Sequence, residues 1–329
     1  MRYAQGMTFY RHIIKKAWEI TWKFRFLWFF GLFTALLGNG GEYEIIMKTF
    51  GGDESAGFFP GLKTLADTGI FTMEGLRNVA MTAATDPVNF SVVIIILLLT
   101  LAVGAFLVWL VIISQAALVN SSAKIIQNKK TAFREALQSG MNNFWPVFIL
   151  NLFNRLIFSG IFLLLLIPLV ASLSLAAPLY VALFIIFIPA SIFISFIIKY
   201  SIGYAVVKDQ PLIISLRNGW KLFKENWLIS IEMALLLALI NLALGLIAIF
   251  IVLVLAVPFL FLAAIFIKFG SVAGFWLVVL LGFASFMVLL FLVGAILATF
   301  QVSAWTGLFL ELINKGGTSK IIRMFGKSQ

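Results

Sequence analysis

The sequence contains no cysteine and a single histidine, His12. The absence of cysteine excludes disulfides, thiol redox chemistry and cysteine-based metal sites, and a lone histidine removes most zinc-ligand and proton-shuttle schemes. Charge is also scarce: 11% of the residues are charged, whereas a soluble domain carries about 25%. We therefore predict no cofactor and no metal site, and a chain whose main solvent is lipid.

Motifs that place catalytic groups are missing as well. The chain has no G-x-x-x-x-G-K-[ST], no H-E-x-x-H and no G-x-S-x-G, which are the patterns of phosphate-binding loops, zinc proteases and serine hydrolases. An intramembrane enzyme needs a clustered acid and base, and the apolar runs hold one acid, Glu232, and no histidine. We expect that the protein is not an enzyme.

Apolar residues make up 62% of the 329 residues, with a mean hydropathy of +1.09. A helix needs about 20 apolar residues to cross a hydrocarbon core of about 30 Å. The predicted fold is all-α: a single polytopic membrane domain, 1–329, with six transmembrane helices. The expected spans are 22–38, 88–119, 144–170, 178–206, 227–257 and 271–308. The apolar stretch 258–269 is long enough only for an interfacial or re-entrant turn.

A cleaved signal peptide is the alternative reading of the first span. The apolar stretch 26–37 has about the length of the apolar part of such a peptide. The charged part before it is long and aromatic, however, and no A-x-A-like cleavage site follows. We favour a retained first span.

The positions of the 24 lysines and arginines predict the topology. Most of them precede the odd-numbered spans or follow the last one, and the acids cluster in the loop 41–87. Because cytoplasmic segments carry the excess of basic residues, both termini are expected in the cytoplasm, in a multi-pass protein of the cell membrane. Topology also explains the net charge of +11, so nucleic acid is not an expected partner.

An internal repeat supports the count of six. Each odd span follows a basic amphipathic segment, a polar break and an aromatic residue. In the first segment Tyr10, Ile13, Ile14, Ala17 and Trp18 form the apolar face; in the third it is Leu212, Leu216, Trp220, Phe223 and Trp227. The inner ends of the even spans, 114–117, 199–203 and 300–304, also resemble one another.

The repeat predicts three helical hairpins, each introduced by a cytoplasmic interfacial helix in the membrane plane. The hairpins, counted with those helices, are 7–119 with the outer loop 41–87, then 131–206, then 211–308, followed by a basic cytoplasmic tail, 309–329. Short helices that cap the outer face are expected in the loop.

Two stretches carry a resemblance to a known group. One is FLWFFGL at 26–32 followed by GNGG at 38–41; the other is YAVVKD at 204–209 leading to NGW at 218–220 and NW at 226–227. With the layout, they resemble a broad group of poorly characterised prokaryotic six-span membrane proteins, including the membrane domain attached to some glycerophosphodiester phosphodiesterases and several domain-of-unknown-function families. The resemblance implies an architecture and no shared activity.

Few polar residues lie within the spans. Arg155 lies roughly 15 Å past Trp145, near the bilayer midplane, and shares a helix face with Asn151 and Asn154. Other members of a candidate intramembrane polar site are Glu232, Gln115 and Gln301, with Asn241 deeper. Two interpretations are open: a cytoplasm-facing polar cavity in which Arg155 binds an anion, or an Arg155–Glu232 bridge with amide hydrogen bonds that join helices.

The basic residues of the amphipathic segments have two interpretations too. They are an orientation signal, and they are also candidate contacts for anionic lipids, each contributing about 1 kcal/mol. The candidates are Lys15, Lys16, Lys23, Arg25, Arg134, Arg217, Lys221 and Lys224. The predicted function is that of a non-enzymatic membrane organiser or accessory protein that contacts lipids. The alternative is a small-molecule or lipid transporter or channel with a polar site around Arg155.

Overall fold

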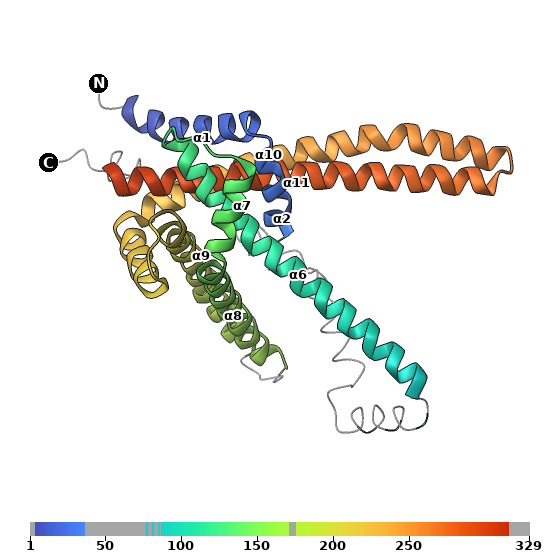
Figure 1. Cartoon of the computed structure of the whole chain (residues 1–329), viewed down its shortest axis with the longest axis horizontal. Coiled ribbons are helices and arrows are strands. Elements are labelled where there is room, and N and C mark those ends of the chain that lie inside the picture. Colours follow the sequence, from blue (N-terminus) through green and yellow to red (C-terminus); the bar gives the residue numbers. More distant parts are fainter. Residues whose placement is uncertain are drawn as a thin grey trace.

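A computed structural model describes residues 4–36, 87–170 and 176–315, together with Arg77, Met81 and Thr85. The helices, labelled as in Figure 1, are α1 Ala4–Lys23, α2 Leu27–Leu36, α6 Pro87–Ile126, α7 Phe133–Asn142, α8 Phe144–Val170, α9 Ala176–Val207, α10 Leu212–Lys268 and α11 Val272–Lys315. The described part of the chain contains no strand, so the all-α prediction is confirmed. Nearly all of the outer loop 41–87, and 316–329 of the predicted tail, lie outside the described residues.

Four helices hold stretches long and apolar enough to cross a membrane. They are Phe90–Ile126, Ile185–Val207, Leu212–Lys268 and Val272–Asn314, and the shorter apolar helices are Leu27–Leu36 and Phe144–Gly160. By length and composition the chain is therefore a membrane-embedded helical protein. A count of six spans stays a prediction.

Helix α10 is longer than the sequence indicated. The stretch 258–269, expected to form a turn, continues the helix through Pro258 to Lys268. A proline removes one hydrogen bond from a helix, but in lipid the helix remains the structure that satisfies the neighbouring backbone groups. The turn into α11 comes later, at 269–271, where Gly270 has a φ of +68°. Glycine adopts this backbone conformation without a steric penalty from a Cβ atom.

The three predicted amphipathic segments are helices, and the polar breaks behind them interrupt the helical path. Segments one and two are α1 and α7, and the third is the start of α10, which is interrupted at Asn226 (φ −131°, ψ 28°). Asn143, which follows α7, and Asn226 use their side chains alike. Each amide donates to the carbonyl four residues earlier, of Ser139 at 3.0 Å and of Leu222 at 3.1 Å.

The core forms where the inner ends of α6, α9 and α11 approach one another. The similar stretches 114–117, 199–203 and 300–304 supply much of it. The hydroxyls of Ser122 and Ser303 lie 2.9 Å apart and join α6 to α11. A Cβ atom on Gly203 of α9 would lie 2.9 Å from the ring of Phe309 on α11. Small residues thus allow the helices to approach closely.

The end of α11 belongs to this core. The predicted tail begins at residue 309, yet α11 continues to Lys315, and Leu308, Phe309, Leu310 and Leu312 are buried. The apolar residues before Asn314 pack against α9 and α1. Residues 309–315 are therefore helical and in part buried, and the cytoplasmic position of the tail stays a prediction.

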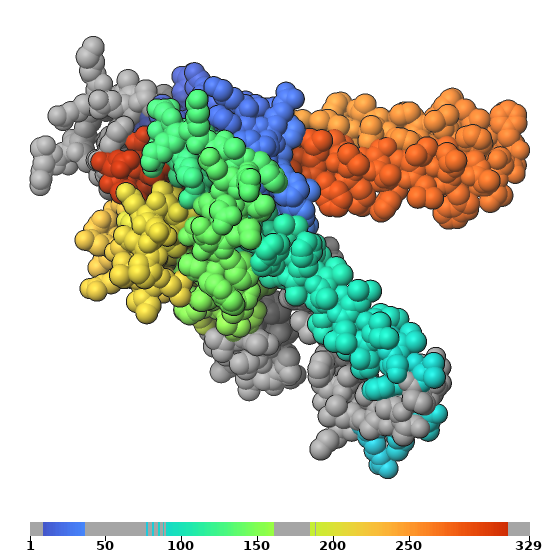
Figure 2. All heavy atoms as spheres, viewed as in Figure 1, coloured from blue at the N-terminus to red at the C-terminus, as the bar shows by residue number. Residues whose placement is uncertain are grey.

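Each amphipathic helix packs against an even-numbered span of the sequence scheme: α1 against α11, α7 against α6, and the start of α10 against α9. From this core α6, the α8–α9 pair and the α10–α11 pair extend in different directions (Figure 1). In the space-filling view the α10–α11 arm stands apart from α6 (Figure 2). The outer parts of these arms expose apolar side chains, as helices surrounded by lipid do.

Candidate functional site

The basic faces of the amphipathic helices form the first candidate site. On α1 the buried side chains are Tyr10, Ile13, Ala17 and Ile20, which matches the predicted apolar face at its first, second and fourth members. Ile14 is half-buried, and Trp18 is exposed. Seven of the eight candidate lipid contacts are exposed: Lys15, Lys23, Arg25, Arg134, Arg217, Lys221 and Lys224. Lys15 lies 4.0 Å from Glu19, but both side chains are exposed, and such a pair contributes little to stability.

Lys16 is the exception among these candidates. Its Nζ atom donates to the carbonyl of Ile126 at 2.7 Å. This carbonyl ends α6, where backbone oxygens lack helical partners and attract cations. Lys16 is half-buried and joins α1 to α6, a contact that a helical wheel cannot show. Its contact with lipid stays a prediction.

The tryptophans of α10 lie on the exposed side of the helix. Trp220 and Trp227 are 55% and 49% exposed, whereas Ser215, Gly219 and Leu222 are buried. A Cβ atom on Gly219 would overlap Ser201 Oγ of α9 and lie 2.9 Å from the carbonyl oxygen of Ile197. The helix thus presents its small residues to α9, which turns both indoles outward.

Exposed tryptophans accompany the basic residues on the other amphipathic segments as well. Trp18 and Trp22 of α1 are 41% and 42% exposed, and Trp145, just after α7, is 67% exposed. Indole rings favour the membrane–water boundary because one edge is apolar and the N–H group is polar. The combination of basic residues and outward tryptophans therefore suits the headgroup region of a bilayer.

The intramembrane polar residues form a second candidate site, which the structure assembles in part. Asn151 of α8 donates its Nδ2 to Gln115 Oε1 of α6 at 2.6 Å and to the carbonyl of Val147 at 2.8 Å. These two predicted residues are brought together, and they join two spans. Arg155 lies half-buried one turn further along α8.

The remaining predicted members are Glu232, Gln301, Asn154 and Asn241. Glu232 accepts a hydrogen bond from the Tyr10 hydroxyl, which links α10 to α1. Gln301 is half-buried on α11, and in the described structure the side-chain oxygens of Asn154 and Asn241 are buried without a hydrogen-bond partner. A common cavity for the set and the Arg155–Glu232 bridge both stay predictions. The link from Tyr10 to Glu232 was missed, although a tyrosine on a buried face requires a partner for its hydroxyl.

We expect Asn151→Leu and Gln115→Leu to be coupled. Each substitution alone should lower the free energy of unfolding by about 1 kcal/mol, because the partner amide loses its hydrogen bond in an apolar setting. The double variant should lose about 0.6 kcal/mol less than the sum, a typical coupling between membrane helices. Unfolding of the four proteins in mixed micelles gives this value, and strict additivity would contradict the contact.

No group of three or more acidic or histidine side chains that could hold a metal ion occurs among the described residues. Asn151 and Gln115 form a hydrogen bond between two helices, and the amphipathic helices present exposed cations that can contact a surface.

No protein-family model, curated protein or solved structure matches this chain. The resemblance to the six-span group stays a prediction.

Proposed function

We propose that the protein is a non-enzymatic membrane organiser or accessory protein that contacts anionic lipids of the cytoplasmic leaflet. One observation carries the proposal: the amphipathic helices α1 and α7 and the start of α10 pack against the inner ends of α11, α6 and α9 and, Lys16 apart, leave the candidate basic side chains exposed. The apolar arms leave the same core (Figure 1). Such a scaffold holds several cationic surfaces in fixed positions relative to a bilayer.

The positive charge of these surfaces favours phospholipid headgroups as the partner. A lysine or arginine near an anionic leaflet contributes about 1 kcal/mol to association, and neighbouring tryptophans hold the helices at headgroup level. The positive-inside rule assigns this side to the cytoplasm. The N-terminal end of α1 and the C-terminal end of α11 also lie on one side of the molecule (Figure 1), in agreement with two cytoplasmic termini.

The proposal predicts that the full-length protein in nanodiscs enriches phosphatidylglycerol over phosphatidylcholine in its bound lipid. A triple variant, Lys15→Gln, Arg134→Gln and Arg217→Gln, removes one exposed charge from each amphipathic helix. We expect its affinity for anionic lipid to fall by about fivefold per charge removed, and enrichment to weaken in high salt because screening reduces these contacts. Lipid co-purified with the protein is measured by mass spectrometry.

Lys268→Gln is the matched control. Lys268 is exposed at the end of α10 that is farthest along the helix from the basic start, so its loss changes net charge without touching the amphipathic helices. We expect Lys268→Gln to keep the enrichment of phosphatidylglycerol over phosphatidylcholine. Equal enrichment in the wild type and the triple variant would contradict the proposed function.

A further inference from the structure

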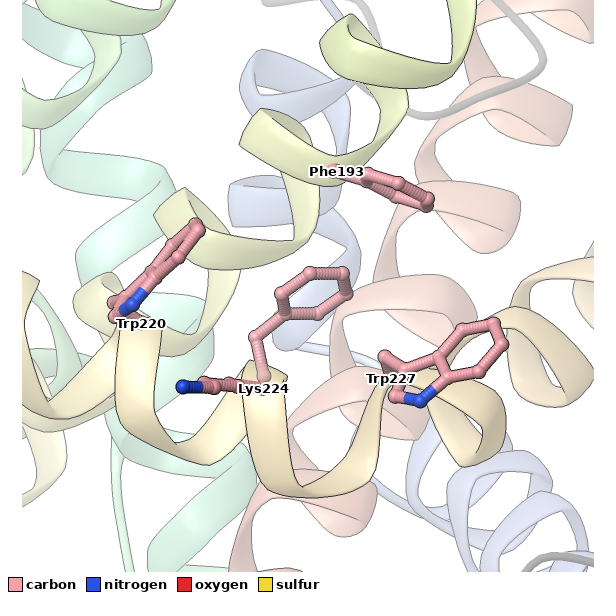
Figure 3. A pocket seen from close by; sticks show the side chains of 5 residues that line it. Phe193, Trp220, Lys224 and Trp227 are labelled. Atoms are coloured by element: carbon pink, nitrogen blue, oxygen red, sulfur yellow. The ribbon is translucent and has the colours of Figure 1, made fainter.

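A surface groove lies between α9 and the start of α10, with a volume of about 460 Å³. Phe193, Trp220, Phe223, Lys224 and Trp227 line it. Figure 3 shows Trp220 and Trp227 at its two ends, Lys224 between them on α10, and Phe193 opposite them on α9. This volume falls within the range of small-molecule sites, about 300–1,000 Å³.

The groove follows from two local features of the sequence. Gly219 allows α10 to approach the backbone of α9, so that the aromatic residues of the two helices meet. Phe223, which is 6% exposed, forms the base, and its ring lies 5.5 Å from that of Phe193. The interruption at Asn226 then changes the path of the helix immediately before Trp227, which is half-exposed at the far end.

The lining combines one cation with aromatic walls. Lys224 is exposed and is the charged residue among the five that line the groove. A lysine can lay its aliphatic stem along apolar surface and keep its ammonium at headgroup level. The groove also spans the junction between an amphipathic helix and a long apolar helix, which is where headgroups meet acyl chains.

We propose that this groove binds one anionic phospholipid, with the headgroup phosphate beside Lys224 and an acyl chain along Phe193 and Trp227. The proposal rests on the proposed function and deepens it, because it assigns one defined lipid site within a generally basic surface. A second protein helix fits less well, because it would remove the Lys224 ammonium from water without a paired charge, at a cost of several kcal/mol. A phospholipid supplies the opposite charge and the apolar chain in one molecule.

The test is native mass spectrometry of the full-length protein in detergent, titrated with phosphatidylglycerol or phosphatidylcholine. We expect the first phosphatidylglycerol molecule to bind more tightly than the first phosphatidylcholine molecule. Lys224→Gln should weaken that first binding event by about fivefold, and Lys224→Arg should retain it. Glycerol phosphate, which offers the headgroup without chains, should not compete.

Lys268→Gln is the matched control, since Lys268 is exposed at the other end of the same helix, outside both the groove and the amphipathic segment. It should leave the first binding event unchanged. Phe193→Ala should weaken the binding of both lipids, because it removes part of the apolar wall and no charge. Thermal unfolding of each variant shows whether it is folded. Equal binding of the two lipids, or equal effects of Lys224→Gln and Lys268→Gln, would overturn the groove assignment.

The two proposals fail separately. If Lys224→Gln has no effect while the triple variant of α1, α7 and α10 loses enrichment, the groove is wrong and the basic surface stands. If the triple variant keeps its enrichment while Lys224→Gln loses the first lipid, the protein has one lipid site and no general preference for anionic lipid.

Discussion

Phe309→Ala is expected to lower the free energy of unfolding by about 3–5 kcal/mol, the usual effect of truncating a buried phenylalanine. The Phe309 side chain is 2% exposed. Its ring covers Gly203 of α9 and meets the ring of Tyr204 edge-on, with centroids 5.1 Å apart. Removing the ring leaves a cavity between α9 and α11 that backbone movement fills only in part.

The measurement is reversible unfolding of the full chain in mixed micelles. Phe291→Ala on the same helix is the control, because Phe291 is 52% exposed and its ring meets lipid or detergent in either state. Its effect should be below about 1 kcal/mol, as for a surface substitution. Similar losses in the two variants would contradict the burial of Phe309 between α9 and α11.

Gly31→Ala should destabilise the protein by about 1–3 kcal/mol, the range for overpacking a well-packed interior. A Cβ atom at Gly31 of α2 would overlap Thr299 Oγ1 and the carbonyl oxygen of Ala295, both on α11. Thr299 is fully buried and its hydroxyl already bonds Ala295 at 2.8 Å. The helices must therefore separate to admit one methyl group.

Gly104→Ala gives a control of the opposite sign. Gly104 lies within α6, and a Cβ atom there meets nothing within 4 Å. Replacing a helical glycine with alanine in open space stabilises a helix by about 0.5–1 kcal/mol. The unfolding temperatures of Gly31→Ala and Gly104→Ala should therefore shift in opposite directions. Two shifts of the same sign would contradict the close approach at Gly31.

Hydropathy and helical periodicity predicted the existence and type of the helices well. The amphipathic segments were found because a stripe such as Tyr10, Ile13 and Ala17 recurs at helical spacing, and that pattern is set locally. Windows of about 20 residues gave the positions of the apolar runs but not their ends. Helix α10 continues past Pro258 because its neighbours remain apolar, and nothing in a hydropathy window marks where such a helix stops.

The side-chain directions were harder to predict for a different reason. In a membrane protein an apolar residue can face protein or lipid, so the tryptophans of α10 fitted either side of the helix. Packing decided the matter: Gly219 faces α9, and Trp220 faces outward. The partner of Lys16 is a carbonyl on another helix, which no local pattern reveals. The role of Arg155 stays a prediction, as does the function of the surrounding polar residues.

The packing of α1 and α2 against α11 has a consequence for the order in which the protein is assembled. The hydroxyl of Thr299 bonds the carbonyl of Leu27, a contact between residues 272 positions apart, and such distant contacts are slow to form. A ribosome makes α11 after the other described helices, so the side of α1 and α2 that faces α11 is covered late, whereas α6 covers another part of their surface early. During synthesis the membrane and α6 therefore hold α1 and α2 in place, and α11 completes their packing.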